Sequence, residues 1–276
     1  MSTPDSISLD ALRKTAIEAA RAAGAVLLEN FEKTLRVDTA YQHDLKLEVD
    51  RLADAAVCKV LRSAFPKHAI MTEESGEAAG SEPYQWIIDP LDGTVNYFGT
   101  LPYFCTSIAC YRIPSEPRQQ STKEIDSIGE PLVGVIHAPA MNEMYVAVAG
   151  AGVTANDVPI RAHPGTRISD AIVCTTMGGM DRTKARMIRV NSAILEHCRK
   201  LRCFGASALD LAYLARGRFS ALYHPEIKTW DIAAGLLMLQ ESGVPFALKP
   251  LQALTWDLTA GAPGIYDGFS AVIAKV

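Results

Sequence analysis

The segment Trp86–Asn96 reads Trp-Ile-Ile-Asp-Pro-Leu-Asp-Gly-Thr-Val-Asn and joins an apolar run to two acidic residues. The apolar run predicts a buried strand that ends at Asp89, and Pro90 fixes the turn that follows. A second carboxylate, Asp92, comes three positions later and precedes Gly93. At the carboxyl end of a strand, such a sequence can direct two carboxylates and a run of backbone N–H groups into one pocket. A metal ion and a phosphate group would both suit that pocket.

The same residues also fit a plain surface turn, because proline presets φ and glycine tolerates positive φ. Two other segments favour the pocket, since each places acidic residues at the edge of an apolar stretch. The pair Glu73-Glu74 follows a predicted strand from His68 to Thr72, and the segment Trp230–Gly235 reads Trp-Asp-Ile-Ala-Ala-Gly. In an extended chain, adjacent side chains point to opposite sides. We therefore expect one of the two glutamates to face the pocket and the other to face solvent or a basic partner.

The composition describes a globular chain with an acidic balance. Its 276 residues are 49% hydrophobic, which is enough for a large core, and its formal net charge is −4. This charge argues against nucleic acid as a partner, and the lack of an apolar run of about 18 residues argues against a membrane span. The polar amino terminus is no secretory signal, and the cysteines form no CxxC pair, so we expect a cytoplasmic protein. The cysteines are Cys58, Cys105, Cys110, Cys174, Cys198 and Cys203.

Helical and strand-like patterns alternate along the chain. A helix is predicted from Ser8, with one apolar face formed by Leu12, Ala16, Ala19, Ala23 and Leu27. A second helix is predicted over 50–65, and 114–131 is predicted to be a solvated excursion between strands. From about Gly150 the order of elements changes to an α/β alternation.

The segments WIIDPLDGTVN (86–96) and WDIAAGLLMLQESG (230–243) carry a family resemblance. From about Leu9 to its end, the sequence resembles the inositol monophosphatase family, within the magnesium-dependent, lithium-sensitive sugar-phosphate phosphatases. The resemblance implies an α/β fold layered as an αβαβα sandwich. It also implies an α+β half over 1–150 with most metal ligands, and an α/β half over 151–276 with Asp231 and the substrate contacts. A homodimer is implied as well.

Acidic residues from three distant places would then meet at one site. Two carboxylates about 4 Å apart repel by roughly 4 kcal/mol at an effective dielectric near 20, so a group of them requires cations. Ligation by oxygen alone suits Mg²⁺, and the lack of a His/Cys cluster beside these acids argues against zinc. The resemblance implies two or three Mg²⁺ ions. The implied ligands are Glu73, Asp89, the Leu91 carbonyl, Asp92 and Asp231.

The resemblance also implies catalytic roles. Glu73 and the Thr94 hydroxyl would position the attacking water, and Asp50 would orient Thr94 or hold a further ion. Asp50 could equally cap a helix, which is a frequent role of aspartate at a helix start. Asp231 has the same alternative, because an aspartate in a first helical turn also complements the helix dipole.

Substrate contacts are implied at both ends of the site. The amides of Gly93 and Thr94 would bind phosphate oxygens beside Asp92 and Asp231. By resemblance, Gly205, Ala206 and Ser207 would contact the alcohol part of the substrate. His224 occupies a position, seven residues before Asp231, at which family members carry an acidic residue.

We therefore predict a Mg²⁺-dependent phosphomonoesterase that acts on inositol monophosphate or a related sugar phosphate. The partner would be a small phosphate ester, with no nucleic acid and no membrane involved. Alternatives within the superfamily are fructose-1,6-bisphosphatase, histidinol-phosphatase and 3'-phosphoadenosine 5'-phosphate phosphatase. The alternative outside enzymes is a regulatory protein that binds metal and phosphate without turnover.

Overall fold

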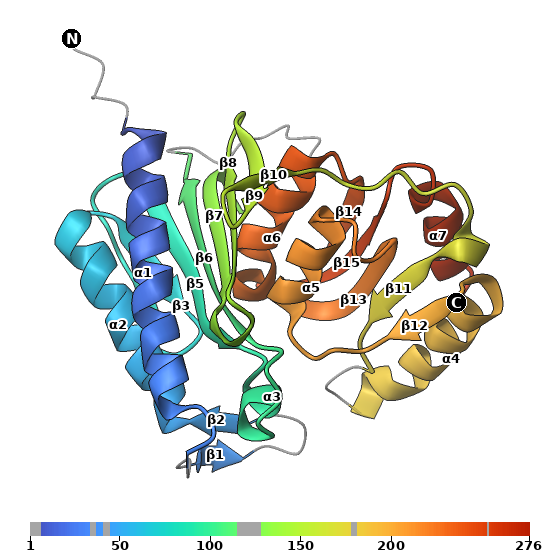
Figure 1. Cartoon of the computed structure of the whole chain (residues 1–276), viewed down its shortest axis with the longest axis horizontal. Helices are drawn as coiled ribbons and strands as arrows, with labels where there is room; N and C mark the ends of the chain where they lie inside the picture. The colour runs from blue at the N-terminus through green and yellow to red at the C-terminus, as the bar shows by residue number, and fades with distance from the viewer. Residues whose placement is uncertain (1–6, 34–36, 41–44, 115–127, 178–180, 253) are drawn as a thin grey trace.

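The structure, a computed structural model, describes residues 7–33, 37–40, 45–114, 128–177, 181–252 and 254–276. Within these ranges, two large β-sheets alternate with three layers of helices (Figure 1). The layers are α1 (Leu9–Asn30) with α2 (Glu48–Ala64), α5 (Ser207–Ala215) with α6 (Thr229–Ser242), and α4 (Asp181–His197) with α7 (Tyr266–Ile273). The predicted α/β fold with αβαβα layering is confirmed.

The first sheet has the strand order β10-β9-β8-β7-β6-β5-β3-β4. Its neighbours run antiparallel except β3 and β5, which are parallel. This exception brings the carboxyl ends of β3 and β5 to the same edge of the sheet. The strands are β3 (Ala69–Thr72), β4 (Gly76–Ala78), β5 (Tyr84–Asp92), β6 (Cys105–Arg112), β7 (Glu130–Ala138), β8 (Glu143–Val148), β9 (Gly152–Ala155) and β10 (Val158–Ile160).

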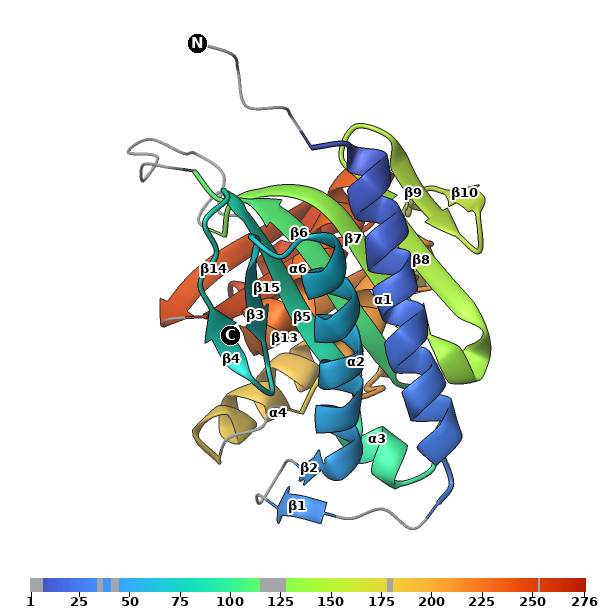
Figure 2. The same cartoon turned by 90° about the vertical axis from the view of Figure 1, so that its left-hand side faces the viewer.

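The helices α1 and α2 lie side by side on one face of the first sheet (Figure 2). The predicted stripe of α1, from Leu12 to Leu27, is fully buried. It packs against β6 and β7, and its alanines leave little side chain between the helix and the sheet. The predicted core role of this stripe is confirmed.

The other face of the first sheet is covered by α6, which approaches very closely. A Cβ atom added to Gly134 of β7 would lie 2.7 Å from the carbonyl oxygen of Ala234 on α6. On its far side, a Cβ added to Gly235 would lie 2.6 Å from the Cβ of Leu211 on α5. Small residues therefore allow α6 to lie tightly between its neighbours, which fixes the position of its first turn.

The second sheet has the order β12-β11-β13-β15-β14. Strands β12, β11 and β13 are parallel, whereas β13, β15 and β14 are antiparallel. The central helices cover one face, and α4 with α7 covers the other (Figure 1). The strands are β11 (Ile172–Thr175), β12 (Lys200–Arg202), β13 (Ala221–Lys228), β14 (Phe246–Gln252) and β15 (Thr255–Gly261).

Smaller elements complete the described chain. A hairpin of β1 (Val37–Ala40) and β2 (Leu45–Leu47) precedes α2, and the short helix α3 (Thr94–Phe98) follows β5. Two 3₁₀ turns span Pro139–Met141 and Ile168–Asp170. Over the described residues, no helix combines the length and the apolar character needed to cross a bilayer.

The change of organisation predicted near Gly150 occurs later in the chain. Strands β9 and β10 form a hairpin that extends the first sheet to Ile160. Its turn residues, Asn156 and Asp157, have φ of 48° and 64°, which is typical of a tight hairpin turn. Of the excursion predicted over 114–131, residues 115–127 lie outside the described residues.

Candidate active site

The carboxyl ends of β3 and β5 form one corner of the first sheet. Thr72 pairs with Ile88 in parallel register, and the N–H of Glu73 donates to the carbonyl of Ile88 at 3.2 Å. Glu73 therefore leaves β3 next to the point where Asp89 stands on β5. The register of β5 against β6 is irregular between Asp89 and Asp92, which changes the direction of the chain at the motif.

The first turn of α6 brings a third acidic residue to this corner. Asp231 accepts a hydrogen bond from the Lys228 N–H at 3.2 Å, so it caps the helix as well. Glu73, Asp89 and Asp231 each offer an oxygen atom, and these oxygens lie within 4.8 Å of one another. The structure thus brings together acids separated by more than 150 positions in the sequence. We call this group, with Asp92, the carboxylate corner.

Asp92 links the corner to the second half of the chain. Its side chain is only 8% exposed, and its Oδ2 accepts a hydrogen bond of 2.7 Å from the Ala208 N–H in the first turn of α5. The Cys105 thiol lies 3.7 Å from the same oxygen. The two halves of the chain therefore meet at the Asp92 carboxylate.

The electrostatics of the corner favour a bound cation. Burial raises the pKa of Asp89 and of Asp231 well above the usual range, and the neighbouring carboxylates raise both further. Burial raises the pKa of Asp92 to about 7, although the Ala208 N–H opposes this shift. Such a group is costly to ionise alone, and divalent cations would relieve the cost.

The turn between Asp89 and Thr94 is held by its own hydrogen bonds. The Leu91 N–H donates to Asp89 Oδ1, and the Thr94 hydroxyl donates to the Leu91 carbonyl, both at 3.0 Å. Gly93 has φ of 92°, and a Cβ there would lie 3.0 Å from the Tyr103 carbonyl. Glycine is therefore required both by conformation and by space.

Asp50 lies in the first turn of α2 and is buried. Its Oδ2 accepts a 2.6 Å hydrogen bond from the Leu47 N–H, while Oδ1 is buried without a partner among the described residues. Burial raises the pKa of Asp50 to about 7. The side chain therefore caps α2, as the alternative prediction has it, and retains one oxygen for another role. The hydrogen bonds described for Asp50 and Thr94 go to Leu47 and Leu91, so they do not link the two side chains.

Lys46 is the basic residue expected beside the glutamate pair. Its Nζ lies 2.6 Å from Glu74 Oε1 and 3.6 Å from Glu73 Oε1. Glu74 thus faces the basic partner, and Glu73 joins the carboxylate corner. The sequence does not identify Lys46 as the partner of the glutamates, because Lys46 lies on the short strand β2 within a polar segment.

The segment expected to contact the substrate alcohol lies beside the corner. Asn96 donates hydrogen bonds to the carbonyls of Tyr103 and Phe204, at 2.8 and 2.7 Å, and so fastens Gly205 to the central motif. Gly205 has φ of 83°, and Ala206 precedes the first residue of α5. The role of Asn96 was not predicted, although it belongs to the motif.

His224 is buried beside Ser207, the first residue of α5. Its Nδ1 lies 3.3 Å from the Ser207 hydroxyl, and its Nε2 lies 3.3 Å from Asp210 Oδ2. Asp210 was not predicted, since it stands within an apolar helix without a motif. The Nζ of Lys228 lies 3.3 Å from the Thr255 hydroxyl.

Comparison with known proteins agrees with this geometry. A family model described as the inositol monophosphatase family matches residues 8–268. The protein named Nus factor SuhB of Xylella fastidiosa is 36% identical over 230 residues, which cover 82% of this chain and 78% of that protein. The Nus factor SuhB of Escherichia coli (strain K12) is 33% identical over 263 residues, which cover 93% of both chains.

Solved structures have the same fold. The extragenic suppressor protein suhB from Bartonella henselae matches with a TM-score of 0.85 and 28% identity, covering 96% of this chain and 99% of its own. The inositol monophosphatase from Anabaena matches with a TM-score of 0.80 and 31% identity, covering 97% of both chains. The matched segment includes both signature motifs and nearly the whole fold, so the chain belongs to the inositol monophosphatase family.

Proposed function

We propose that the protein is a Mg²⁺-dependent phosphomonoesterase that hydrolyses inositol monophosphate or a related sugar phosphate. The observation that carries the proposal is the meeting of Glu73, Asp89 and Asp231 within 4.8 Å, beside the buried Asp92. Membership of the inositol monophosphatase family supports the same reaction class.

The donor atoms of the corner fit magnesium. All of them are oxygens, and burial with mutual repulsion raises the pKa of the carboxyl groups, so a hard divalent cation is the complementary partner. Bound Mg²⁺ would supply positive charge that activates water and stabilises the leaving oxygen. One ion would be held by Glu73, Asp89 and the Leu91 carbonyl. A second would be held by Asp89, Asp92 and Asp231, and Asp50 would orient Thr94 or hold a further ion.

The remaining groups of the motif would act on the substrate directly. Glu73 and the Thr94 hydroxyl would orient the attacking water, and the free oxygen of Asp50 is available to accept a proton or to hold an ion. The N–H groups of Gly93 and Thr94 would bind the phosphate oxygens. The αL conformation of Gly93 supports this, because it turns the chain directly before α3.

The alcohol part of the substrate would lie against Gly205, Ala206, Ser207 and His224. Both ring nitrogens of His224 face protein groups, Ser207 and Asp210, whereas a carboxylate at this position would accept from two hydroxyl groups of the substrate. Other phosphate esters are therefore candidate substrates beside inositol monophosphate. The competing activities are those of a fructose-1,6-bisphosphatase, a histidinol-phosphatase and a 3'-phosphoadenosine 5'-phosphate phosphatase.

The test is phosphate release from a panel of these esters, with and without Mg²⁺. We expect turnover that requires Mg²⁺, stops with a chelator and favours one ester class. Asp92→Asn should abolish this turnover while circular dichroism shows an unchanged fold. Turnover that is unaffected by a chelator or by Asp92→Asn would contradict the proposal.

A second candidate function follows from the names of the relatives. Proteins about one-third identical to this chain over most of its length are named Nus factors. This chain would then act as a regulator that binds metal and phosphate without turnover and works through protein contacts. A homodimer would be its form under either function. Asp92→Asn separates the two functions, because it would remove hydrolysis and leave a purely protein-binding role intact in a pull-down assay.

A further inference from the structure

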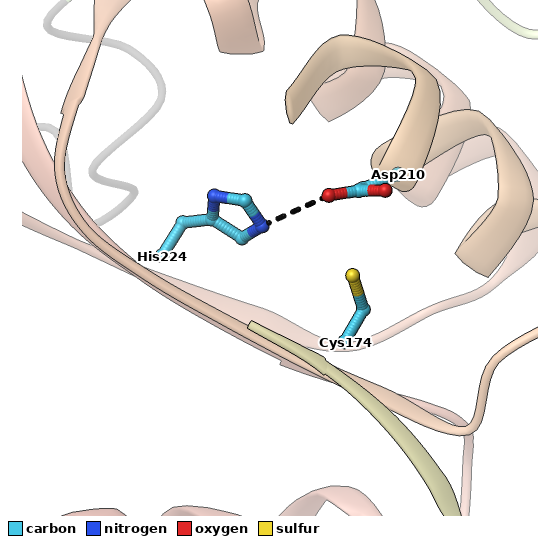
Figure 3. Close-up of side chains that lie close together, drawn as sticks. All are labelled: Cys174, Asp210 and His224. Atoms are coloured by element: carbon cyan, nitrogen blue, oxygen red, sulfur yellow. Dashed lines mark ion pairs between the residues drawn. The ribbon is translucent and has the colours of Figure 1, made fainter. Parts of the chain in front are cut away.

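A second group of ligating side chains lies outside the carboxylate corner. Cys174, Asp210 and His224 come from β11, α5 and β13 and point toward a common space (Figure 3). One sulfur, one oxygen and one nitrogen atom of the three lie within 4.8 Å of one another. Cys174 and Asp210 are fully buried, and His224 is 4% exposed. We call this group the mixed-ligand cluster.

The fold explains how these residues meet. Cys174 of β11 pairs with Leu222 of β13 in parallel register. Side chains two positions apart on a strand share a face, so His224 points to the same side of the sheet as Cys174. The helix α5 packs on that face and supplies Asp210 from above. The arrangement is thus built into the strand register and the helix position.

Hydrogen bonds hold the outer atoms of the cluster, whereas its inner atoms form an ion pair without a hydrogen bond (Figure 3). The Tyr103 hydroxyl donates to Asp210 Oδ1 at 2.7 Å, and Ser207 lies 3.3 Å from His224 Nδ1. Asp210 Oδ2 and His224 Nε2 are 3.3 Å apart, yet both are buried without a hydrogen-bond partner among the described residues. Buried polar atoms without a partner cost about 1–3 kcal/mol each, so this pair calls for a ligand.

Cys174 does not have the surroundings that are typical of a nucleophilic cysteine. Burial and the adjacent Asp210 carboxylate raise the pKa of the Cys174 thiol far above its ordinary value. Reactive cysteines have the opposite shift and lie in exposed, electropositive surroundings. A cation between the three side chains would instead take up the thiolate and the carboxylate together.

We propose that Cys174, Asp210 and His224 bind a transition-metal ion, Zn²⁺, at a site separate from the carboxylate corner. With metal–ligand distances of about 2.0–2.1 Å, the edge of a tetrahedron is about 3.4 Å, close to the 3.3 Å between His224 Nε2 and Asp210 Oδ2. Sulfur with imidazole nitrogen selects zinc-like ions over Mg²⁺. Tyr103 and Ser207 occupy the positions of the outer hydrogen-bond partners that orient metal ligands.

The surroundings provide a fourth ligand position. Cys174 pairs with Arg202 across β11 and β12, and the next residue, Cys203, is exposed. Cys203 is near enough to raise the pKa of the Cys174 thiol further. The fourth ligand would therefore be the thiol of Cys203 or a water molecule. This site does not depend on the proposed phosphatase activity.

Cobalt titration tests the site with a spectroscopic readout. Co²⁺ is added to the reduced, metal-free protein in saturating Mg²⁺, which occupies oxygen ligands but does not compete at sulfur. We expect one Co²⁺ per chain with a thiolate-to-cobalt band in the near ultraviolet, displaced by Zn²⁺. Cys174→Ser should lose this band, whereas Cys110→Ala, a buried cysteine of the other core cluster, should keep it. A missing band in the unmodified protein, or a band that persists in Cys174→Ser, would overturn the proposal.

A second variant keeps the test decisive if Cys174→Ser does not fold. His224→Gln removes the nitrogen ligand and leaves the thiol in place. We expect a thiolate band that appears only at a Co²⁺ concentration more than about 100-fold higher, because losing a direct ligand costs more affinity than the 10–100-fold lost with an outer hydrogen-bond partner. An unchanged titration in a folded His224→Gln protein would exclude histidine from the site and reject the assignment.

Discussion

The carboxylate corner and the mixed-ligand cluster are built by similar means from very different sequence. In each, strands of one sheet and an early turn of a central helix bring ligating groups into one space. The corner uses oxygen alone and comes from long motifs. The cluster uses sulfur, nitrogen and oxygen and comes from three single residues. The difference in donor atoms would lead the corner to favour Mg²⁺ and the cluster to favour Zn²⁺.

The largest expected effect comes from breaking the corner at α6. Asp231→Asn keeps the shape of the side chain and the helix cap but removes a charge from the group. We expect kcat for phosphate release to fall by about 10³-fold, or roughly 4 kcal/mol. The control is Asp170→Asn, an exposed acid paired with Arg199 at 2.6 Å, which should keep full activity. Co²⁺ binding at the mixed-ligand cluster should survive in both variants, and its loss in Asp231→Asn would show that the two sites are not independent.

The second expected effect is that the free energy of unfolding depends on pH through a carboxyl group of the carboxylate corner. The pKa of Asp92 rises from 3.8 to about 7 on folding, so the native state binds more protons than the unfolded state between these values. Without metal, stability should therefore fall as pH rises from about 4 to 7, by on the order of 4 kcal/mol for this group. Thermal unfolding measures it.

The effect of Mg²⁺ on the Tm tests the same electrostatic account. At pH 7, Mg²⁺ should raise the Tm, because it stabilises the ionised carboxylates, and at pH 4.5 the rise should be small. Asp92→Asn should flatten the dependence on pH and weaken the response to Mg²⁺. A Tm that increases steadily from pH 4 to 7 in a chelator would contradict the electrostatic account of the corner.

How well the sequence predicts each site follows from how local its signal is. Asp89, Asp92 and Gly93 lie within one turn, and Asp231 opens a helix with a recognisable small-residue pattern, so the corner is visible in the sequence. The register between two paired strands, by contrast, cannot be predicted from the sequence of either strand alone. His224 faces Cys174 only because β13 pairs with β11 at Leu222, and no local pattern encodes that pairing.

The helices and strands also differ in how well the sequence predicts them. The stripe of α1 is predicted because its periodicity is strong over many residues, and the strand β5 because its apolar run is continuous. The hairpin of β9 and β10 is missed because its strands have only four and three residues, too few for a periodic pattern. Strand β14 contains Pro250, which argues against a strand, but it lies at the edge of its sheet, where proline is tolerated.

A smaller effect should come from the helix layer that both sites share. Gly235→Ala places a Cβ 2.6 Å from the Cβ of Leu211, so α5 and α6 must separate. We expect a loss of about 1–3 kcal/mol in the free energy of unfolding, as for overpacking, and weaker metal binding at both sites. Gly268→Ala is the matched control, since nothing lies within 4 Å of a Cβ there. In α7 that alanine should stabilise the protein by about 1 kcal/mol, and equal stability of the two variants in urea would refute the packing argument.

The smallest effect concerns the balance of charge at the corner. Lys46 lies 2.6 Å from Glu74 and 3.6 Å from Glu73, and about a third of its side chain is exposed, so its contribution is weakened by solvent. Lys46→Met removes this positive charge and should make Mg²⁺ bind more tightly, by up to about fivefold or 1 kcal/mol. The concentration of Mg²⁺ that gives half-maximal activity measures the change, and the affinity of the mixed-ligand cluster for zinc or cobalt should not change.

Lys67→Met is the control, because Lys67 is exposed and pairs with Glu82 at 3.7 Å. Weaker Mg²⁺ binding in Lys46→Met than in Lys67→Met would mean that Lys46 holds Glu73 in position rather than competing with the ion for it.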